Sequence, residues 1–275
     1  MAEKIKVGEI NIGGDNPLVL IAGPCVIESE AIVMETAERI KEIAGRVGMP
    51  FIFKASYLKE NRSSVESFQG PGLREGLRIL EKVKEAVGVP VLSDVHCREE
   101  AERAGGVLDV VQIPAYLCMQ TQLTLAVARW AKVVNVKKGQ FLAPQDMKHI
   151  VGKLESAGNT SILLTERGSC FGYHNLVTDM RSLPIMREMG YPVVFDVTHT
   201  IRIYGRPSSD PAGGQPEFVP FLARAAVATG CDAIFIETHP RVEEALCDAA
   251  SMWPLDELEE LLVQLKGIDS LVKGD

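Results

Sequence analysis

The chain has 275 residues and a formal net charge of −8, and 46% of its residues are hydrophobic. This apolar content can fill a large core, whereas the acidic balance argues against nucleic acid or an anionic membrane as a partner, since both attract basic surfaces. The first residues are too polar for a secretory signal, and no apolar run approaches the ~18 residues needed to cross a bilayer, so we expect a cytoplasmic protein.

Residues 1–17 are predicted to form an N-terminal extension. The stretch KIKVGEINI at 4–12 alternates polar and apolar residues around Gly8, which predicts a small β-hairpin. We expect this hairpin to cap the floor of the domain that follows.

Eight short apolar runs follow, each succeeded by a stretch with helical spacing. The runs lack the alternation of a half-exposed strand, which is typical of a parallel sheet buried on both faces. They occupy 18–25, 51–56, 89–96, 110–115, 133–139, 161–168, 193–199 and 233–239. The helical patterns fall at 29–46, 72–87, 98–104, 120–130, 145–157, 180–189, 216–229 and 255–267. Eight such units predict a single (β/α)8 barrel over residues 1–275, without a second domain.

One long irregular segment, residues 200–216, is rich in glycine, proline and serine. A loop of this length in a compact domain is more often functional than idle. Because it follows the seventh strand, it is expected at the active face of the barrel, and we interpret it as a lid.

The apolar runs end in residues that can carry chemistry. The carboxyl ends of barrel strands meet at one mouth, so these side chains should converge. The residues at or near the ends of the runs are Cys25, Lys54, Asp94, Lys137, Arg167, His199 and Glu237, and further cations at or just past strand ends are Lys59, Arg62 and Lys138. An acidic protein with cations gathered at one mouth is expected to bind a small polyanion.

Four of the candidate residues suit a metal. Cys25, His199 and Glu237 end strands one, seven and eight, which become neighbours when a barrel closes, and Asp248 lies in the loop after strand eight. Thiolate, imidazole and carboxylate together suit Zn, Fe or Mn rather than Ca or Mg. His96 and His239 compete for the same role.

A phosphate site is expected in the loop KASYLKENRSS at 54–64. It offers two lysines, an arginine, an asparagine and several hydroxyls, although a solvated polar loop has the same composition. The chain lacks the phosphate-binding loop of nucleotide triphosphatases, the dinucleotide fingerprint and the G-x-S-x-G nucleophile elbow.

Long stretches of the chain resemble the 3-deoxy-D-manno-octulosonate 8-phosphate synthases. The matching segments include IAGPCVIES, KENRSSVESFQGPGL, VVQIPAYLC, NVKKGQFLAP, TERGSCFGYHNLVTDMRSLPIM, FDVTHT and FIETHPRVEEALCDAAS, over about residues 18–267. The resemblance implies a cytoplasmic transferase of lipopolysaccharide biosynthesis. This enzyme condenses phosphoenolpyruvate with D-arabinose 5-phosphate and a metal-bound water, and it assembles as a homotetramer.

The resemblance also implies site residues. Cysteine after the first strand marks the metal-dependent branch, with Cys25, His199, Glu237 and Asp248 as ligands of one divalent ion. Lys54, Lys59, Lys137 and Arg167 would hold phosphoenolpyruvate, with Ser56 and Gln112 nearby. Asn61, Arg62 and Ser63 would face the sugar phosphate. Asp94 and Gln140 would lie around the reacting centre. We expect Lys59, Lys137, Asp94 and His199 to be the catalytic residues.

The acceptor side departs from the family pattern. Met119 replaces an arginine that reaches the sugar phosphate of a neighbouring subunit, Gln122 and Leu58 replace aspartates, and Glu60 replaces a small residue. Either another cation, such as Arg202 or Arg206, binds the sugar phosphate in place of the missing arginine, or the acceptor is a different aldose. A Schiff-base aldolase using Lys137 and a barrel that binds without turnover are further alternatives.

Overall fold

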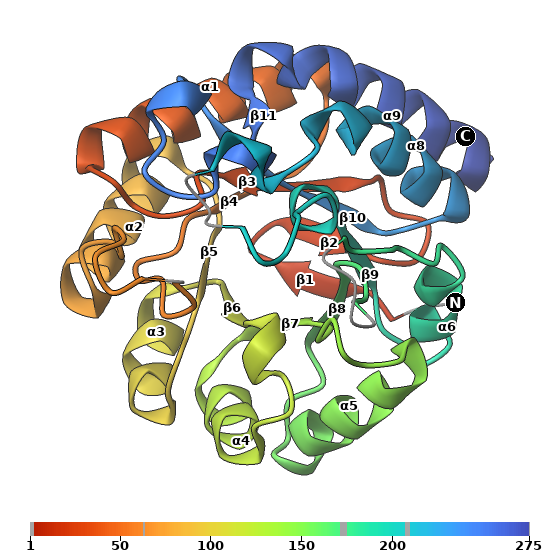
Figure 1. The fold of residues 1–275 in the computed structure, drawn as a ribbon. Helices are drawn as coiled ribbons and strands as arrows, with labels where there is room; N and C mark the ends of the chain where they lie inside the picture. Colours follow the sequence, from red (N-terminus) through yellow and green to blue (C-terminus); the bar gives the residue numbers. More distant parts are fainter. Residues whose placement is uncertain (1–2, 63, 171–174, 207–209, 275) are drawn as a thin grey trace.

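The computed structural model describes residues 3–62, 64–170, 175–206 and 210–274. Eight parallel strands form a closed barrel, because β10 pairs with both β9 and β3, and helices surround it (Figure 1). The strands are β3 (Val19–Gly23), β4 (Phe51–Lys54), β5 (Val91–Asp94), β6 (Val110–Ile113), β7 (Val133–Lys137), β8 (Ile162–Glu166), β9 (Val193–Asp196) and β10 (Ala233–His239). The predicted (β/α)8 barrel is confirmed.

The outer helices follow the strands as predicted. They are α1 (Glu30–Val47), α2 (Leu73–Val87), α3 (Ala101–Val107), α4 (Thr121–Trp130), α5 (Met147–Ser156), α6 (Ser182–Arg187), α8 (Val219–Thr229) and α9 (Leu258–Lys273). Their apolar faces share one buried cluster with the outward side chains of the strands. α1 begins at Ser29, whose hydroxyl accepts a hydrogen bond from Ile32 N, and ends at Gly48 in the left-handed conformation.

The predicted seventh strand is too long. Strand β9 ends at Asp196, and residues 197–199 belong instead to a short helix, α7 (Val197–Thr200). The Asp196 carboxylate accepts a hydrogen bond from His199 N and caps this turn. His199 therefore lies on a helical turn above the barrel, and its spacing from Asp196 brings both side chains to the same side.

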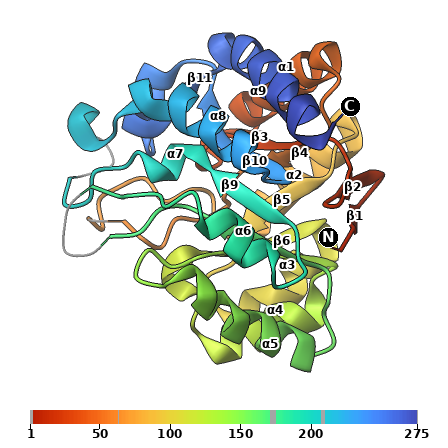
Figure 2. The same ribbon diagram turned by 90° about the vertical axis from the view of Figure 1, so that its right-hand side faces the viewer.

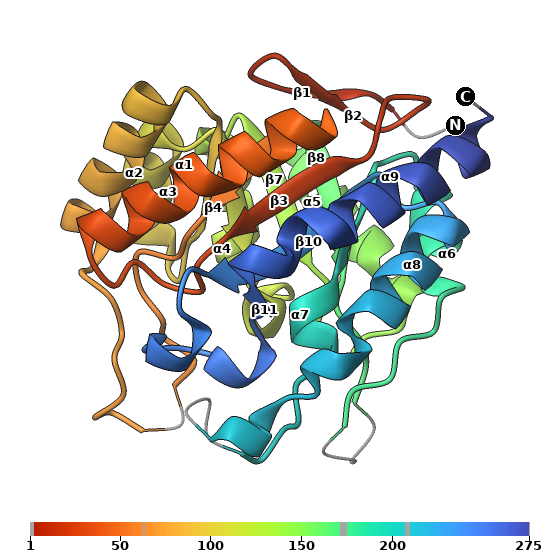
Figure 3. The same cartoon turned by 90° about the horizontal axis from the view of Figure 1, so that it is seen from above.

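The predicted N-terminal hairpin is confirmed. Strands β1 (Ile5–Val7) and β2 (Ile10–Ile12) pair antiparallel around Gly8, whose φ of 57° suits glycine. Ile5, Val7 and Ile12 join a buried cluster with inward-facing barrel residues such as Ile21 and Phe235. Figures 2 and 3 show the hairpin at the end of the barrel opposite the long loops, so it covers the floor.

The inward-facing side chains of the barrel differ in polarity between its floor and its mouth. The lower inward positions are apolar and pack with the hairpin, including Ile52, Leu92, Val194 and Phe235. Because side chains alternate along a strand, the next inward positions lie two residues later. They are polar or charged: Lys54, Asp94, Gln112, Asn135, Thr165, Asp196 and Glu237, all buried. The sequence thus builds a dry floor and a charged upper half.

The predicted lid at 200–216 doubles back at the mouth. Ile203 N donates to Gly213 O at 2.9 Å, and Arg202 pairs with Gly214. Positions 207–209 lie outside the described residues. The chain after β10 is held at the same end by β11 (Trp253–Pro254), which pairs with Thr238 and His239. Closure over a ligand remains a prediction.

Gly23 offers a test of how tightly β3 approaches β4. A Cβ there would lie 2.0 Å from Lys54 O, whereas one on exposed Gly45 of α1 would meet nothing within 4 Å. We expect Gly23→Ala to lower the free energy of unfolding by about 3 kcal/mol or more. Gly45→Ala should raise it by up to about 1 kcal/mol. Urea denaturation measures both, and equal effects would contradict the close approach.

Candidate active site

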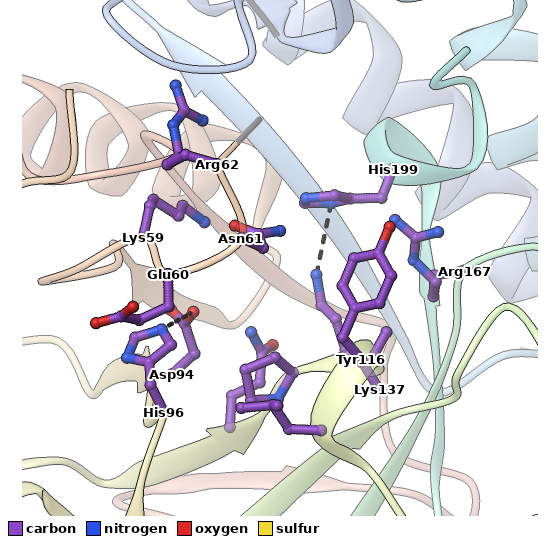
Figure 4. Close-up of a pocket in the computed structure, with 14 residues that line it drawn as sticks. Lys59, Glu60, Asn61, Arg62, Asp94, His96, Tyr116, Lys137, Arg167 and His199 are labelled. Carbon is purple, nitrogen blue, oxygen red and sulfur yellow. Dashed lines mark hydrogen bonds and ion pairs between the residues drawn. The ribbon is translucent and has the colours of Figure 1, made fainter. Parts of the chain in front are cut away.

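A cavity of about 420 Å³ opens at the carboxyl ends of the strands. Figure 4 shows charged side chains from several strands and loops directed into it. A second cavity of about 350 Å³ shares Asn61, Arg62, Tyr116, Arg167 and His199 with the first. It extends to Arg202, Tyr204, Arg206 and Asp248. The two volumes form one continuous mouth between the loop after β4 and the segment after α7.

Most predicted site residues line this mouth. The first cavity contains Lys59, Asn61, Arg62, Asp94, Gln112, Lys137, Arg167 and His199. Lys54, Ser56 and Gln140 are buried beside it but are absent from the lining formed by the described residues. Ser63 lies outside the described residues.

Two of the predicted lysines are neutralised by buried carboxylates. Lys54 Nζ lies 2.6 Å from Glu237 Oε1 and 2.9 Å from Cys25 O. Lys137 Nζ lies 2.5 Å from Asp196 Oδ2 and 3.5 Å from His199 Nδ1. Burial lowers the pKa of Lys137, and Asp196 counteracts part of that effect. Lys54 and Lys137 therefore each have a buried carboxylate as a partner.

Unlike Lys54 and Lys137, Lys59 and Arg167 form no ion pair with any carboxylate that the structure describes. They are only 8% and 5% exposed. Arg167 donates to the hydroxyl of Tyr204, and its Nε is buried without a hydrogen-bond partner. Burying an unpaired cation is costly, so these two groups point to an anionic ligand.

A chain of hydrogen bonds supports Asp94. His96 Nε2 lies 3.1 Å from Asp94 Oδ2, and Tyr57 donates to Glu100 at 2.8 Å, on the far side of the imidazole. Burial by itself lowers the pKa of His96, but its contacts with Asp94 and Glu100 raise the pKa to about 9. His96 thus orients Asp94, and within the described chain neither His96 nor His239 joins a metal-binding group.

The four predicted metal ligands converge. His199, Glu237 and Asp248 each offer an atom within 4.8 Å of the others, and so do Cys25, Cys247 and Asp248. His199 Nε2 lies 3.8 Å from Glu237 Oε1 and 3.9 Å from Asp248 Oδ2. Asp248 belongs to both groups and joins them into one cluster.

Several features of this cluster fit a divalent cation. Glu237 Oε2 is buried without a hydrogen-bond partner, and Asp248 adopts a left-handed φ of 54°, which is uncommon for residues other than glycine. Burial lowers the pKa of His199, which favours the neutral imidazole that metals require. Its Nδ1 lies 2.9 Å from Asp196, so Nε2 is directed at the cluster.

Sequence reasoning missed four residues of the mouth. Asp196 carried the only available signal, because it is a carboxylate inside a buried apolar run. Tyr116 and Tyr204 line the cavities, and Cys247 lies against Cys25. Nothing in their local sequence distinguishes these three from ordinary loop residues.

The fold and the site define a barrel enzyme whose mouth suits a small, multiply charged anion beside a group of side chains that could hold a metal ion. The chain belongs to the DAHP synthetase I family, whose model matches residues 2–274.

Individual relatives are similar over almost the whole chain. A protein of Geotalea uraniireducens is 60% identical over 99% of this chain and 100% of its own length. Relatives in Geotalea daltonii and Geobacter sulfurreducens are 59% and 57% identical, each also over 99% of this chain and 100% of their own length. All three are called 2-dehydro-3-deoxyphosphooctonate aldolase. The resemblance to octulosonate 8-phosphate synthases is confirmed.

The raised pKa of His96 predicts a pH-dependent stability. A folded pKa of about 9 against an unfolded value near 6.5 adds about 3 kcal/mol, which is fully present below pH ~6.5 and lost as the pH rises through about 9. Urea unfolding at pH 6 and pH 9.5 should show this loss. It should vanish in His96→Gln and persist in His149→Gln, a control at an exposed position. An unchanged profile in His96→Gln would contradict the assignment.

Proposed function

We propose that the protein condenses phosphoenolpyruvate with D-arabinose 5-phosphate and water to give 3-deoxy-D-manno-octulosonate 8-phosphate and inorganic phosphate. The proposal rests on two buried cations, Lys59 and Arg167, in the mouth of a barrel of this family, neither of which has a carboxylate partner among the described residues. The name of the relatives refers to the same phosphorylated eight-carbon sugar acid.

Phosphoenolpyruvate binds on the Arg167 side of the mouth. Arg167 and Lys59 hold its phosphate and carboxylate, and Lys137 lies between them in Figure 4. Lys54, Ser56, Gln112 and Gln140 support this side as a buried shell. Charged donors in a dry cavity bind phosphate strongly and stabilise it as it leaves.

The sugar phosphate binds on the opposite side, near Asn61 and Arg62. Met119 does not substitute for an arginine there, since it is 41% exposed and lines neither cavity of the described chain. Arg202 and Arg206 enter the second cavity from the 200–216 segment. We assign to these two arginines the contact with the sugar phosphate that Met119 cannot make. We also expect the 200–216 segment to close over the acceptor.

The chemistry follows from this arrangement. C3 of phosphoenolpyruvate forms a bond to the aldehyde carbon, whose oxygen takes a proton. The water oxygen bonds to C2 and becomes the ketone oxygen as the bond between C2 and the phosphate oxygen breaks; of the two protons the water loses, one balances the proton taken up by the aldehyde oxygen and the other leaves with the phosphate. Lys137, whose pKa burial lowers, is suited to supply the proton at the aldehyde oxygen. Asp94, held by His96, accepts a hydrogen bond from a hydroxyl group and orients it.

A divalent ion, Zn, Fe or Mn, would be held by Cys25, His199, Glu237 and Asp248, and it would supply Lewis acidity beside the reacting carbons. The enzyme would act in the cytoplasm. Exposed Tyr116, Met119 and Phe141 around the mouth support the expected homotetramer.

Release of phosphate tests the proposed reaction. Phosphoenolpyruvate with arabinose 5-phosphate should release phosphate, and other aldoses or aldose phosphates should release much less. Chelator should abolish turnover, and Zn, Fe or Mn should restore it. Borohydride should not trap a covalent adduct on Lys137. Folded protein without turnover under these conditions would reject the proposal.

The assignment of Arg206 predicts a selective effect on the acceptor. Loss of one guanidinium contact to phosphate at a partly exposed site costs about 1.5 kcal/mol, or roughly tenfold in KM. Arg206→Gln should therefore raise KM for arabinose 5-phosphate about tenfold and leave KM for phosphoenolpyruvate unchanged. Arg181→Gln, an exposed arginine paired with Asp179, is the matched control. Equal changes for both substrates would contradict the assignment.

A further inference from the structure

The two cysteines beside the proposed metal cluster lie in direct contact. Cys25 Sγ and Cys247 Sγ are 2.8 Å apart, and the two residues are separated by 222 positions in the chain. A disulfide bond measures about 2.05 Å, so the sulfurs need to approach by less than 1 Å. No role assigned above requires this contact of Cys247.

The fold, rather than a flexible loop, brings these sulfurs together. Cys25 follows β3, and Cys247 lies in the segment between β10 and β11. Strands β3 and β10 are hydrogen-bonded neighbours, with Gly23 opposite Glu237. The segment that carries Cys247 is then anchored by the pairing of Trp253 with Thr238. The contact is therefore built into the closure of the barrel.

The surroundings place the pair next to the mouth. Both cysteines are buried, at 0% and 2% exposure. Arg62 Nη1 donates to Cys247 Sγ at 2.9 Å, and Arg62 itself lines both cavities. Asp248, the next residue in the chain, lines the second cavity. Arg62 and Asp248 thus place the sulfur of Cys247 beside residues that line the mouth, the side from which a small oxidant such as hydrogen peroxide would approach.

We propose that Cys25 and Cys247 are a modification site that hydrogen peroxide oxidises to an intramolecular disulfide. One sulfur attacks the O–O bond and becomes a sulfenic acid, with loss of one water. The second sulfur then attacks the first and displaces a second water. Two thiols and one peroxide thus give one disulfide and two waters, and a dithiol reductant reverses the change.

This modification and metal binding exclude each other. If Cys25 binds a metal it does so as a thiolate, and a sulfur in a disulfide is no longer a thiolate donor. Oxidation would remove Cys25 from the ligand set, and a bound ion would occupy the sulfur that peroxide attacks. This consequence, unlike the disulfide itself, rests on the metal site proposed above.

The test compares metal-free and Zn-loaded full-length protein treated with hydrogen peroxide. Metal-free protein should lose two hydrogens in intact mass, and a non-reducing peptide map should join the Cys25 and Cys247 peptides. Dithiothreitol should reverse both changes, and Zn binding by calorimetry should be lost until it does. Linkage in the Zn-loaded protein should be at least about tenfold slower.

Two cysteine variants serve as controls for the oxidation experiment. Cys247→Ser should gain oxygen at Cys25 without a link, and Cys97→Ser, which removes an exposed thiol, should behave as the unaltered protein. Oxygen addition at Cys25 without linkage in the unaltered protein would overturn the modification site. Linkage at the same rate with Zn would overturn the exclusion. Phosphate release by untreated protein reports the proposed function separately, so either proposal can fail alone.

Discussion

The upper half of the barrel depends on one constraint, the cost of burying charge. Lysine and carboxylate side chains project inward where water is excluded, and an ion there is tolerated only with a partner. The structure meets this cost by pairing lysines with buried carboxylates: Lys54 with Glu237 and Lys137 with Asp196 inside the barrel, and Lys138 with Glu166 at the ends of the neighbouring strands β7 and β8. Removing one partner of such a pair would leave an uncompensated charge, typically worth about 3 to 5 kcal/mol.

These pairs also set the geometry of the site. Lys54 holds Glu237 through Oε1, which also lies 3.8 Å from His199 Nε2, and Oε2 is buried without a hydrogen-bond partner among the described residues. Asp196 caps the turn that carries His199 and contacts its Nδ1, so one carboxylate orients both a lysine and an imidazole. The same interactions that compensate buried charge therefore position the groups to which we assign chemistry.

The sequence predicted the barrel because both the inward and the outward strand positions are apolar near the floor. The strands therefore lack the alternation of polar and apolar residues found in a half-exposed sheet, which indicates a sheet covered on both faces. It predicted Cys25, Lys137 and Glu237 as site residues because each lies at or near the end of such a run. It did not predict the turn at His199, since the cap depends on the Asp196 side chain rather than on any break in the pattern. Cys247 and Tyr204 were missed because loop contacts arise from closure, which local sequence does not encode.

Asp248 connects the two halves of the mouth. Arg202 forms an ion pair with it, and Arg62 lies 3.7 Å away, so two cations of the acceptor side contact a residue of the metal cluster. A divalent ion bound there would compete with Arg202 for the same carboxylate. Release of Arg202 would then leave a cation in the second cavity, beside Arg206, where the sugar phosphate is proposed to bind. Metal binding and acceptor binding would thereby favour each other, because each gains from the same exchange of partners at Asp248.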